Sequence, residues 1–493
     1  MAQPQHYLAI DLGAESGRAI LGTFDGERLT LEEIHRFGNG PVKLPDGLHW
    51  DILRLWTEIK TALTIAAHKP GVTLAAIGVD TWGVDFGLLD EHGVLLGNPY
   101  HYRDARTDGM VEAAFQRMPR EAIFAATGIQ FMSLNTLYQL FAMVTQKSPA
   151  LQAARTFLTI PDLLNYWLSG RAVCEFTNAT TTQCLNPHRC EWATALLETL
   201  DIPTHIFPEI VQPGTVLGEL RAEVADDAGC GRVPVVAPAC HDTGSAVAAI
   251  PADNADFAWI SSGTWSIMGA EVSEPVVNAQ TLKYNFTNEG GVANTWRLSK
   301  NIAGLWLVQE CRRTWAHAGE EFSYGELTRL AAEAQPFAAI IDPDDAEFYK
   351  PGDMPARIRD YCVRTGQPAP ESKGAIIRAA LEGLALKYRW VLERLEEILG
   401  RRLDPIHIIG GGTQNRLLNQ LTADATGRRV VAGPIEATAS GNVMLQAVAL
   451  GHLESVAAGR RVIAQSFEVV PYEPRDRSGW DEAYQRFVEL IEL

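Results

Sequence analysis

The sequence predicts an α/β protein of two domains. Its 493 residues exceed the usual size of one domain, short apolar runs alternate with amphipathic segments, and one strand–turn–strand pattern occurs in each half. The repetition indicates a diverged structural duplication with a boundary near residue 248. Because no Pro- or Ser-rich linker lies there, we expect two packed domains, 1–247 and 248–493, with a cleft between them.

The first half predicts an antiparallel meander, then a helix and a buried strand. Glycine-containing turns separate the strands of the meander, and Asp51 is a candidate cap for the helix, which Pro70-Gly71 would stop. The predicted strands of this half are, in order, 7–10, 19–24, 29–37 and 74–79.

The second half repeats these features and adds a long helix. Apolar residues at helical spacing predict a helix over 374–399, with Ser372 as its cap and Gly400 as its stop. A shorter helical segment is predicted at 305–313. The strand-like runs are 258–261, 265–270, 282–286, 295–298 and 405–409.

Composition and charge exclude several classes of protein. A formal net charge of −18 repels polyanions, which argues against nucleic acid or an anionic membrane as a partner. No apolar stretch approaches the roughly 18 residues that a membrane span needs. The residues before Asp11 lack a secretory signal, and seven cysteines, an odd number without a Cys-x-x-Cys pair, favour free thiols and a cytoplasmic location.

Three glycine-containing turns are candidate phosphate cradles. The octet Asp11–Arg18 lies between two predicted strands, and Ser261–Ser266 is its counterpart in the second half. Each one alone is equally well an ordinary tight hairpin. The triple glycine Gly410–Gly412 offers a flat backbone to a base or phosphate, although a strand-to-helix turn explains one of its glycines.

Asp242 is the candidate catalytic carboxylate. It follows a hydrophobic run and precedes a helical segment at 246–250, so it is placed to accept a proton from a hydroxyl. From spacing alone, a helix N-cap explains it better. No nucleophile elbow and no His-Glu-x-x-His accompany His241, which excludes hydrolase triads and zinc sites of those types.

Three polar segments have both a binding and a structural interpretation. Asp80–Phe86 mixes carboxylates, a hydroxyl and aromatic rings, as a polyol site needs, but Trp82 and Phe86 fit a hydrophobic core equally well. Tyr102–Thr107 fits a solvated turn better than a ligand-orienting arginine. The run Thr177–Thr182 fits a polar loop.

Taken together, these segments resemble the FGGY carbohydrate kinases of the actin-like, ribonuclease-H-like ATPase superfamily. The resemblance implies two ribonuclease-H-like domains with the catalytic cleft between them. It spans nearly the whole chain in order. Its motifs are AIDLGAESGR (9–18), VDTWGVDF (79–86), YRDART (102–107), NTLYQL (135–140), TNATTTQ (177–183), HDTGSAV (241–247), SSGTWS (261–266), TNEGG (287–291), KNIAGLWLVQ (300–309) and GGGTQNRLLNQLTADATG (410–427).

The resemblance also implies site residues. Asp242 would be the proton acceptor, and Mg²⁺ would sit near Asp11 on the phosphates of ATP. The residues implied to contact the sugar are Gly83, His241, Asp242, Thr243 and Asn301. Those implied to contact ATP are Ala14, Glu15, Ser16, Gly17, Arg18, Thr264, Gln309 and Gly411. Glu15 departs from the small residue expected at its position and brings negative charge toward the phosphates.

The activity implied is ATP-dependent phosphorylation of a ketose, with O1 of L-rhamnulose as the acceptor. The first domain would bind the sugar and contain the first phosphate turn, and the second domain would bind ATP. The alternatives are L-fuculose or a pentulose as the substrate, or a non-catalytic actin-like ATPase. We expect a sugar and ATP as the only small partners, and a monomer or small homo-oligomer.

Overall fold

The computed structural model describes residues 3–252 and 254–492, and their contacts divide the chain into two compact units. Each unit combines stretches that are far apart in sequence. Unit 1 comprises Met1–Pro251, Val272–Leu298 and Ala437–Phe467. Unit 2 comprises Ala252–Glu271, Ser299–Glu436 and Glu468–Leu493. The division of roles at residue 248 stays a prediction.

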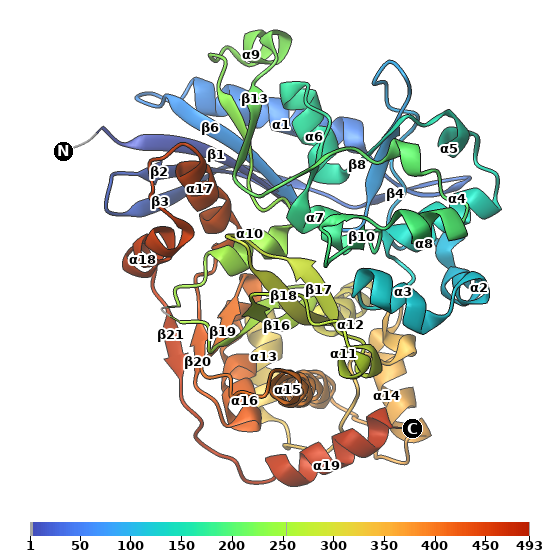
Figure 1. Cartoon of the computed structure of the whole chain (residues 1–493). Coiled ribbons are helices and arrows are strands. Elements are labelled where there is room, and N and C mark those ends of the chain that lie inside the picture. The colour runs from blue at the N-terminus through green and yellow to red at the C-terminus, as the bar shows by residue number, and fades with distance from the viewer. Residues whose placement is uncertain (1–2, 253, 493) are drawn as a thin grey trace. The chain divides into compact units, whose positions relative to one another are not determined.

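Unit 1 is built on a six-stranded mixed sheet with the strand order β13-β14-β6-β1-β2-β3 (Figure 1). The predicted meander is confirmed, because β1, β2 and β3 pair antiparallel, while β1, β6 and β14 run parallel. The bounds are β1 Gln5–Leu12, β2 Ser16–Phe24, β3 Leu29–Gly38, β6 Leu74–Thr81, β13 Thr215–Glu219 and β14 Pro234–Ala237.

The other elements of unit 1 are mostly helices and short strand pairs. The predicted cap of α1 is confirmed, since the Asp51 carboxylate accepts from the N–H of Arg54. The elements are β4 Pro41–Leu44, β5 Gly47–Trp50, α1 Ile52–Ala67, β7 Phe86–Leu89, η1 Ala105–Thr107, α2 Met110–Arg117, α3 Arg120–Thr127, α4 Thr136–Thr145, α5 Pro149–Ala153, β8 Thr156–Thr159, α6 Ile160–Ser169, β9 Cys174–Glu175, α7 Phe176–Thr181, β10 Leu185–Asn186, β11 Glu191–Trp192, α8 Thr194–Thr199, η2 Thr204–Ile206, β12 Ile210–Val211, α9 Ala222–Ala228, α10 Asp242–Ala248, α11 Ala279–Lys283, β17 Thr287–Gly290, α17 Ala437–Ala449 and α18 Val456–Ser466.

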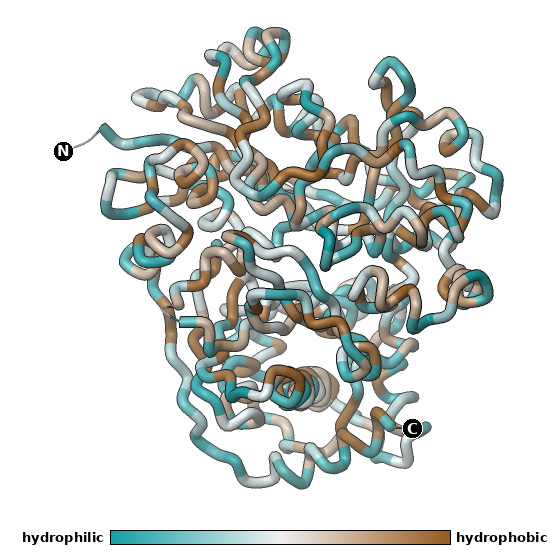
Figure 2. Tube along the Cα trace, viewed as in Figure 1, coloured by the Kyte–Doolittle hydropathy of each residue, from teal (hydrophilic) through white to brown (hydrophobic). Residues whose placement is uncertain are grey.

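Unit 2 contains most of a seven-stranded sheet with the order β17-β18-β16-β15-β19-β20-β21. The long helix α15 packs against α13 and α16 and carries hydrophobic and hydrophilic residues on different sides (Figure 2). Its predicted ends are confirmed by the Ser372 cap and by left-handed Gly400. The elements are β15 Ala258–Ser262, β16 Ser266–Val272, β18 Trp296–Ile302, α12 Trp306–His317, α13 Tyr324–Glu333, η3 Ala346–Phe348, α14 Met354–Arg364, α15 Lys373–Leu399, β19 Ile406–Ile409, η4 Gly411–Gln414, α16 Arg416–Thr426, β20 Val430–Ala432, β21 Val470–Tyr472 and α19 Trp480–Ile491.

The prediction of a strand at 282–286 is wrong. Residues Ala279–Lys283 form the helix α11 instead. Asn278 and Thr281 make a capping box at its start, in which each side chain meets the backbone of the other, and this local signal outweighs the apolar run.

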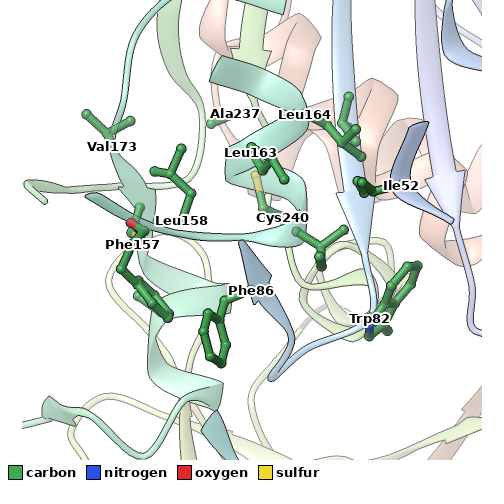
Figure 3. Packing of buried hydrophobic residues seen from close by; sticks show 14 of the residues in the cluster. Ile52, Trp82, Phe86, Phe157, Leu158, Leu163, Leu164, Val173, Ala237 and Cys240 are labelled. Carbon is green, nitrogen blue, oxygen red and sulfur yellow. The ribbon is translucent and has the colours of Figure 1, made fainter. Parts of the chain in front are cut away.

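A large hydrophobic cluster fills unit 1 between the sheet and its helices. Phe86 packs on Phe157, with ring centres 5.0 Å apart, while Cys240 lies beside Leu163 (Figure 3). All seven cysteines are free thiols, as expected. Among the helices of residues 3–252 and 254–492, none has the length and hydropathy that a membrane span requires.

Helix α17 packs against β1, β6 and α10 although it follows them by almost 200 residues or more. Gly441 of α17 lies against α10, where an added Cβ would lie 1.8 Å from the carbonyl oxygen of Ser245. Only glycine allows this contact, so this position fixes how near the two helices lie.

We predict that Gly441→Ala destabilises the protein by about 1–3 kcal/mol, because the new methyl group must push α17 and α10 apart. The gain in helix propensity, about 1 kcal/mol, is too small to offset this. The control is Gly231→Ala, where an added Cβ meets nothing within 4 Å. Thermal unfolding measures both, and equal melting temperatures for the two variants would contradict the prediction.

Candidate active site

Three carboxylates gather where parallel strands of unit 1 end. The register of β1 and β6 places Asp11 opposite Asp80. The N–H of Thr81 donates to the carbonyl of Cys240 at 2.9 Å, which brings the start of α10 to the same edge. Asp242 is the first residue of that helix. Negative charge therefore accumulates at one edge of the sheet.

Asp80 is completely buried in this group. Its Oδ2 accepts from Nδ2 of Asn442 at 2.5 Å, while its Oδ1 has no hydrogen-bond partner among the described residues. Burial and the charge of Asp11 raise the pKa of Asp80 well above its ordinary value. Asn442 lies on α17, and no sequence signal tied it to this site.

The first glycine turn is a tight β-hairpin, as predicted. The N–H of Gly13 donates to the carbonyl of Ser16 at 2.9 Å, and Nδ2 of Asn39 donates to the carbonyl of Gly13 at 2.8 Å. Arg18 lies opposite Asp11 across the hairpin and donates to its Oδ2 at 2.5 Å. The turn thus has a fixed backbone, with a cation next to Asp11 and an exposed Glu15 at its tip.

Asp242 is not a helix N-cap, so that alternative is wrong. The N-cap of α10 is His241, whose side chain makes no capping bond. The Oδ1 of Asp242 accepts from the N–H of Thr243 at 2.5 Å and from its Oγ1 at 3.1 Å. The side chain keeps 29% of its surface exposed. Burial of the carboxyl raises its pKa, which suits a general base.

His241 contacts two buried charged residues that the sequence did not single out. Its Nδ1 lies 3.3 Å from Oε2 of Glu289 and 3.1 Å from Nη2 of Arg297. Its Nε2 lies 3.6 Å from Oδ1 of Asp242. Burial alone would raise the pKa of Glu289, but His241 and Arg297 hold it below its ordinary value. In the sequence, Glu289 stood out only as a member of the TNEGG motif, without a role of its own.

Glu175 fixes the backbone that carries His241. Its carboxylate accepts from the N–H of Cys240 at 3.0 Å, from Thr177 through both its N–H and its Oγ1, and from the N–H of Asn178. The loop interpretation of residues 177–182 is therefore wrong, because these residues form the buried helix α7 and its C-cap.

Asp85 joins three of the motifs through buried hydrogen bonds. It accepts from the indole N–H of Trp50 at 2.6 Å and of Trp82 at 3.0 Å, and from Nε2 of Gln139 at 2.8 Å. Burial raises its pKa to about 6. Arg106 donates to the amide oxygen of Gln139 at 2.6 Å.

Burial decides the interpretations that the sequence left open for Tyr102–Thr107 and for Trp82 and Phe86. The solvated-turn interpretation of Tyr102–Thr107 is wrong, since Tyr102, Asp104 and Thr107 are buried. Trp82 and Phe86 both belong to the hydrophobic cluster, each with 6% of its surface exposed. Gly83 follows Trp82, and an added Cβ there would lie 2.9 Å from Oγ1 of Thr181, so this turn also packs closely.

In unit 2 the Thr264 turn is held against the start of α12. The N–H of Leu305 donates to the carbonyl of Gly263 at 3.1 Å, and the N–H of Trp306 donates to that of Thr264 at 3.0 Å. Gly304 has a φ of +58° and lies so close to the turn that an added Cβ would be 2.4 Å from the carbonyl carbon of Trp265.

The triple glycine lies beside this turn, because β15 and β19 pair in parallel up to Ser261 and Ile409. Gly410 needs its φ of +84°, and an added Cβ on Gly412 would be 2.0 Å from Oγ of Ser262. At Gly411 an added Cβ meets nothing within 4 Å. Folding thus accounts for the outer two glycines and leaves the middle one with an open face.

Two more predicted residues lie near these turns. Gln309 is in the first turn of α12, and its Oε1 is buried without a hydrogen-bond partner among the described residues. Asn301 lies near the end of β18, two residues before Ala303, whose N–H donates to Oδ1 of Asp344 at 2.9 Å. The predicted nucleotide residues of unit 2 thus share one neighbourhood, and those of unit 1 share another.

The class of protein to which the fold and the site conform is a carbohydrate kinase, as the family comparison shows. Residues 6–249 match the N-terminal domain of the FGGY family of carbohydrate kinases, and residues 258–450 match the C-terminal domain. The chain belongs to this family, so it is an enzyme that uses ATP as co-substrate.

Particular relatives are similar over nearly the whole chain. A rhamnulokinase of Bacteroides thetaiotaomicron is 47% identical over 99% of both chains. A rhamnulokinase of Oceanobacillus iheyensis is 41% identical over 94% of this chain and 97% of its own. Among solved structures, a gluconate kinase from Lactobacillus acidophilus has a TM-score of 0.82 at 18% identity, covering 99% of this chain and 98% of its own. Plasmodium falciparum glycerol kinase with ADP has a TM-score of 0.80 at 17% identity, with the same coverages. These structures show the same fold.

We predict that Glu175→Gln lowers the melting temperature and the activity together. The amide must turn an N–H toward backbone donors, and a buried polar group without a partner costs about 1–3 kcal/mol. The matched control is Glu191→Gln, whose side chain is exposed in the same unit. Circular dichroism and a coupled ADP assay measure both effects, and an unchanged Glu175→Gln protein would show that these hydrogen bonds do not matter.

Proposed function

We propose that the enzyme transfers the γ-phosphoryl group of ATP to O1 of L-rhamnulose, giving L-rhamnulose 1-phosphate and ADP in L-rhamnose breakdown. The observation that carries the choice of sugar is the similarity to rhamnulokinases over nearly the full length of both chains. The three carboxylates at the sheet edge of unit 1 and the two glycine turns in unit 2 support the chemistry of phosphoryl transfer.

Asp242 is proposed as the general base. Its Oδ1 already accepts two hydrogen bonds from Thr243, so Oδ2 is the oxygen placed to take the proton of the sugar hydroxyl. The raised pKa of the carboxyl makes it a stronger base than an ordinary aspartate. The deprotonating oxygen then attacks the γ-phosphorus in line as ADP leaves.

The same unit supplies most of the groups proposed to hold the sugar. Gly83, His241 and Thr243 stand beside Asp242 or at the end of β6, and Asn301 is the contribution from unit 2. Hydrogen-bonding groups at fixed positions discriminate the configuration of sugar hydroxyls because a mismatched hydroxyl leaves a buried polar group unpaired.

ATP is proposed to contact the backbone of Ala14–Arg18 in unit 1 and Thr264, Gln309 and Gly411 in unit 2. The open face of Gly411 and the unpartnered Oε1 of Gln309 support a ligand at those two positions. Backbone N–H groups of tight turns stabilise phosphate oxygens. Domains 1–247 and 248–493 are proposed to divide these roles as the sequence predicts.

Mg²⁺ is proposed to accompany ATP near Asp11. Oxygen donors suit this ion, and the unpartnered Oδ1 of buried Asp80 fits a nearby cation or its water. Within the described ranges no group of three His, Cys, Asp or Glu side chains is arranged as a metal-ligand set, so Asp11 and phosphate oxygens would share the ion with water. When bound, it neutralises charge on the phosphates.

The location and the assembly of the protein stay predictions. The free thiols support a reducing, cytoplasmic location. A monomer or a small homo-oligomer remains the expected assembly.

A panel of ketoses tests the substrate. We predict that kcat/KM for L-rhamnulose exceeds that for its 6-hydroxy analogue by less than about 100-fold, because apolar surfaces reject an added hydroxyl only modestly. L-fuculose and a pentulose should be poorer still. ADP release is followed by a coupled assay, and EDTA should abolish it. A faster reaction with L-fuculose or a pentulose would overturn the assignment of L-rhamnulose as the substrate. ADP release with no ketose present would overturn the proposal that the enzyme phosphorylates a sugar.

We predict that Asp242→Asn folds and binds ATP but loses about 10²- to 10⁴-fold in kcat, because an amide cannot accept the proton. In the wild type the base must be ionised, so kcat/KM falls as pH decreases through the pKa of Asp242. That pKa is raised above 3.8, which moves the acid limb toward neutral pH. Near-normal kcat in a folded variant would remove Asp242 from this role.

A further inference from the structure

Two buried charged side chains lie against the ring of His241 in unit 1, and the three residues form one buried cluster. Arg297 is fully buried, Glu289 is 5% exposed and His241 is 7% exposed. Glu289 and Arg297 also contact each other, with Oε2 and Nη2 separated by 3.2 Å. Buried ion pairs are costly to desolvate, and apolar residues often replace them without loss of stability. The cluster therefore calls for an explanation other than stability.

The position of Glu289 is set independently of His241. The N–H of Gly290 donates to Oγ1 of Thr180 at 2.8 Å, and Nε of Arg297 donates to the carbonyl of Gly290 at 2.8 Å. An added Cβ on Gly290 would lie 2.5 Å from the ring of Phe176, so β17 sits as close to α7 as glycine allows. The carboxylate of Glu289 is thus presented to His241 by a rigid strand.

The Nδ1 atom of His241 has two possible partners that need opposite proton placements. Without a proton it accepts a hydrogen bond from Arg297, and with a proton it pairs with Oε2 of Glu289, but it cannot do both at once. That Oε2 atom lies at ion-pair distance and makes no hydrogen bond among the described residues. In the imidazolium, Nδ1 donates to Glu289 and Nε2 also carries a proton. In the neutral ring with Arg297 as donor, the single proton is again on Nε2.

The remaining neutral form would place its proton on Nδ1, toward Glu289. The bare lone pair of Nε2 would then face Oδ1 of Asp242 at 3.6 Å. A lone pair directed at a carboxylate is repelled by its negative charge. Because Arg297 can donate to Nδ1, the tautomer with the proton on Nε2 is favoured over this form.

We propose that Arg297 is a positioning residue that keeps the proton of the neutral His241 ring on Nε2, directed at Oδ1 of Asp242, while Glu289 pairs with the ring when it is charged and both nitrogens carry a proton. This role rests on the proposed function of Asp242 as the base. The distance of 3.6 Å is longer than a hydrogen bond, and such contacts tighten when substrate binds. Oδ1 then has donors from His241 and Thr243, and Oδ2 is left for the sugar hydroxyl.

The other ionisable groups whose charge acts on Asp242 are on neighbouring strands. Asp11 raises the pKa of Asp242, and Asp80 interacts with both of these carboxylates. Arg18 pairs with Asp11. A useful variant must leave these groups in place, which substitutions at Glu289 or Arg297 do.

The first test is the ring nitrogen spectrum of His241 in the full-length protein labelled with ¹⁵N-histidine. The His241 signals are assigned by their loss in His241→Asn. We expect a protonated Nε2 between pH 6 and pH 8. An unprotonated Nε2 at pH 8 in the wild type would overturn the proposal without any variant. The measurement needs no sugar, so it stands even if L-rhamnulose is the wrong substrate.

The second test compares two variants with opposite expectations. Arg297→Met removes the donor to neutral Nδ1, so at pH 8 the proton should move to Nδ1 and kcat should fall about tenfold or more. Glu289→Gln keeps that donor, so Nε2 should stay protonated at pH 8. Arg297→Lys should recover much of the loss. ATP KM should stay within about twofold in all three.

The matched control is Glu58→Gln, which removes the carboxylate from another His–Glu pair of unit 1, that of His35 and Glu58 at 2.6 Å. It should leave kcat and the His241 signals unchanged. A purely structural role for the cluster predicts the same loss of stability and activity in Arg297→Met and Glu289→Gln, with no change of tautomer. That result would overturn the proposal.

Discussion

The parallel pairing of β1, β6 and β14 is the constraint on which the site depends. Parallel strands end at one edge of a sheet, and the register sets Asp11 opposite Asp80 and Thr81 next to His241. Three carboxylates therefore lie close together in a partly desolvated place. Burial raises the pKa values of Asp80 and Asp242 most, and the charge of nearby Asp11 raises both further.

This concentration of charge needs partners, and the fold brings them from distant parts of the chain. Arg18 reaches Asp11 across a hairpin, and Asn442 reaches Asp80 from α17. The amide of Asn442 is in turn held by Nε2 of Gln446 at 2.7 Å, which also donates to the backbone of β1. Helix α17 is thus part of the support of the site as well as of the packing of unit 1.

Asp242, the residue proposed as general base, is held in position before substrate arrives. Hydrogen-bond donors meet one oxygen of Asp242, and Glu175 fixes the backbone that leads into it. In phosphoryl transfer, positioning and electrostatics supply most of the catalysis. The rigid buried contacts around Asp242 are what positioning requires.

The sequence by itself determined the α/β class, the meander, the capped helices α1 and α15, all but one of the strands that it predicted and the kinase family, because periodicity, caps and ordered motifs are local in the chain. It also singled out Asp11, Asp242 and the three glycine turns. Only the tertiary structure decided that 437–467 joins unit 1, that Tyr102, Asp104 and Thr107 are buried, and that Glu289 and Arg297 meet His241. Contacts between residues about 50 to 360 positions apart leave no periodic signal, since they depend on strand order and helix packing rather than on local spacing.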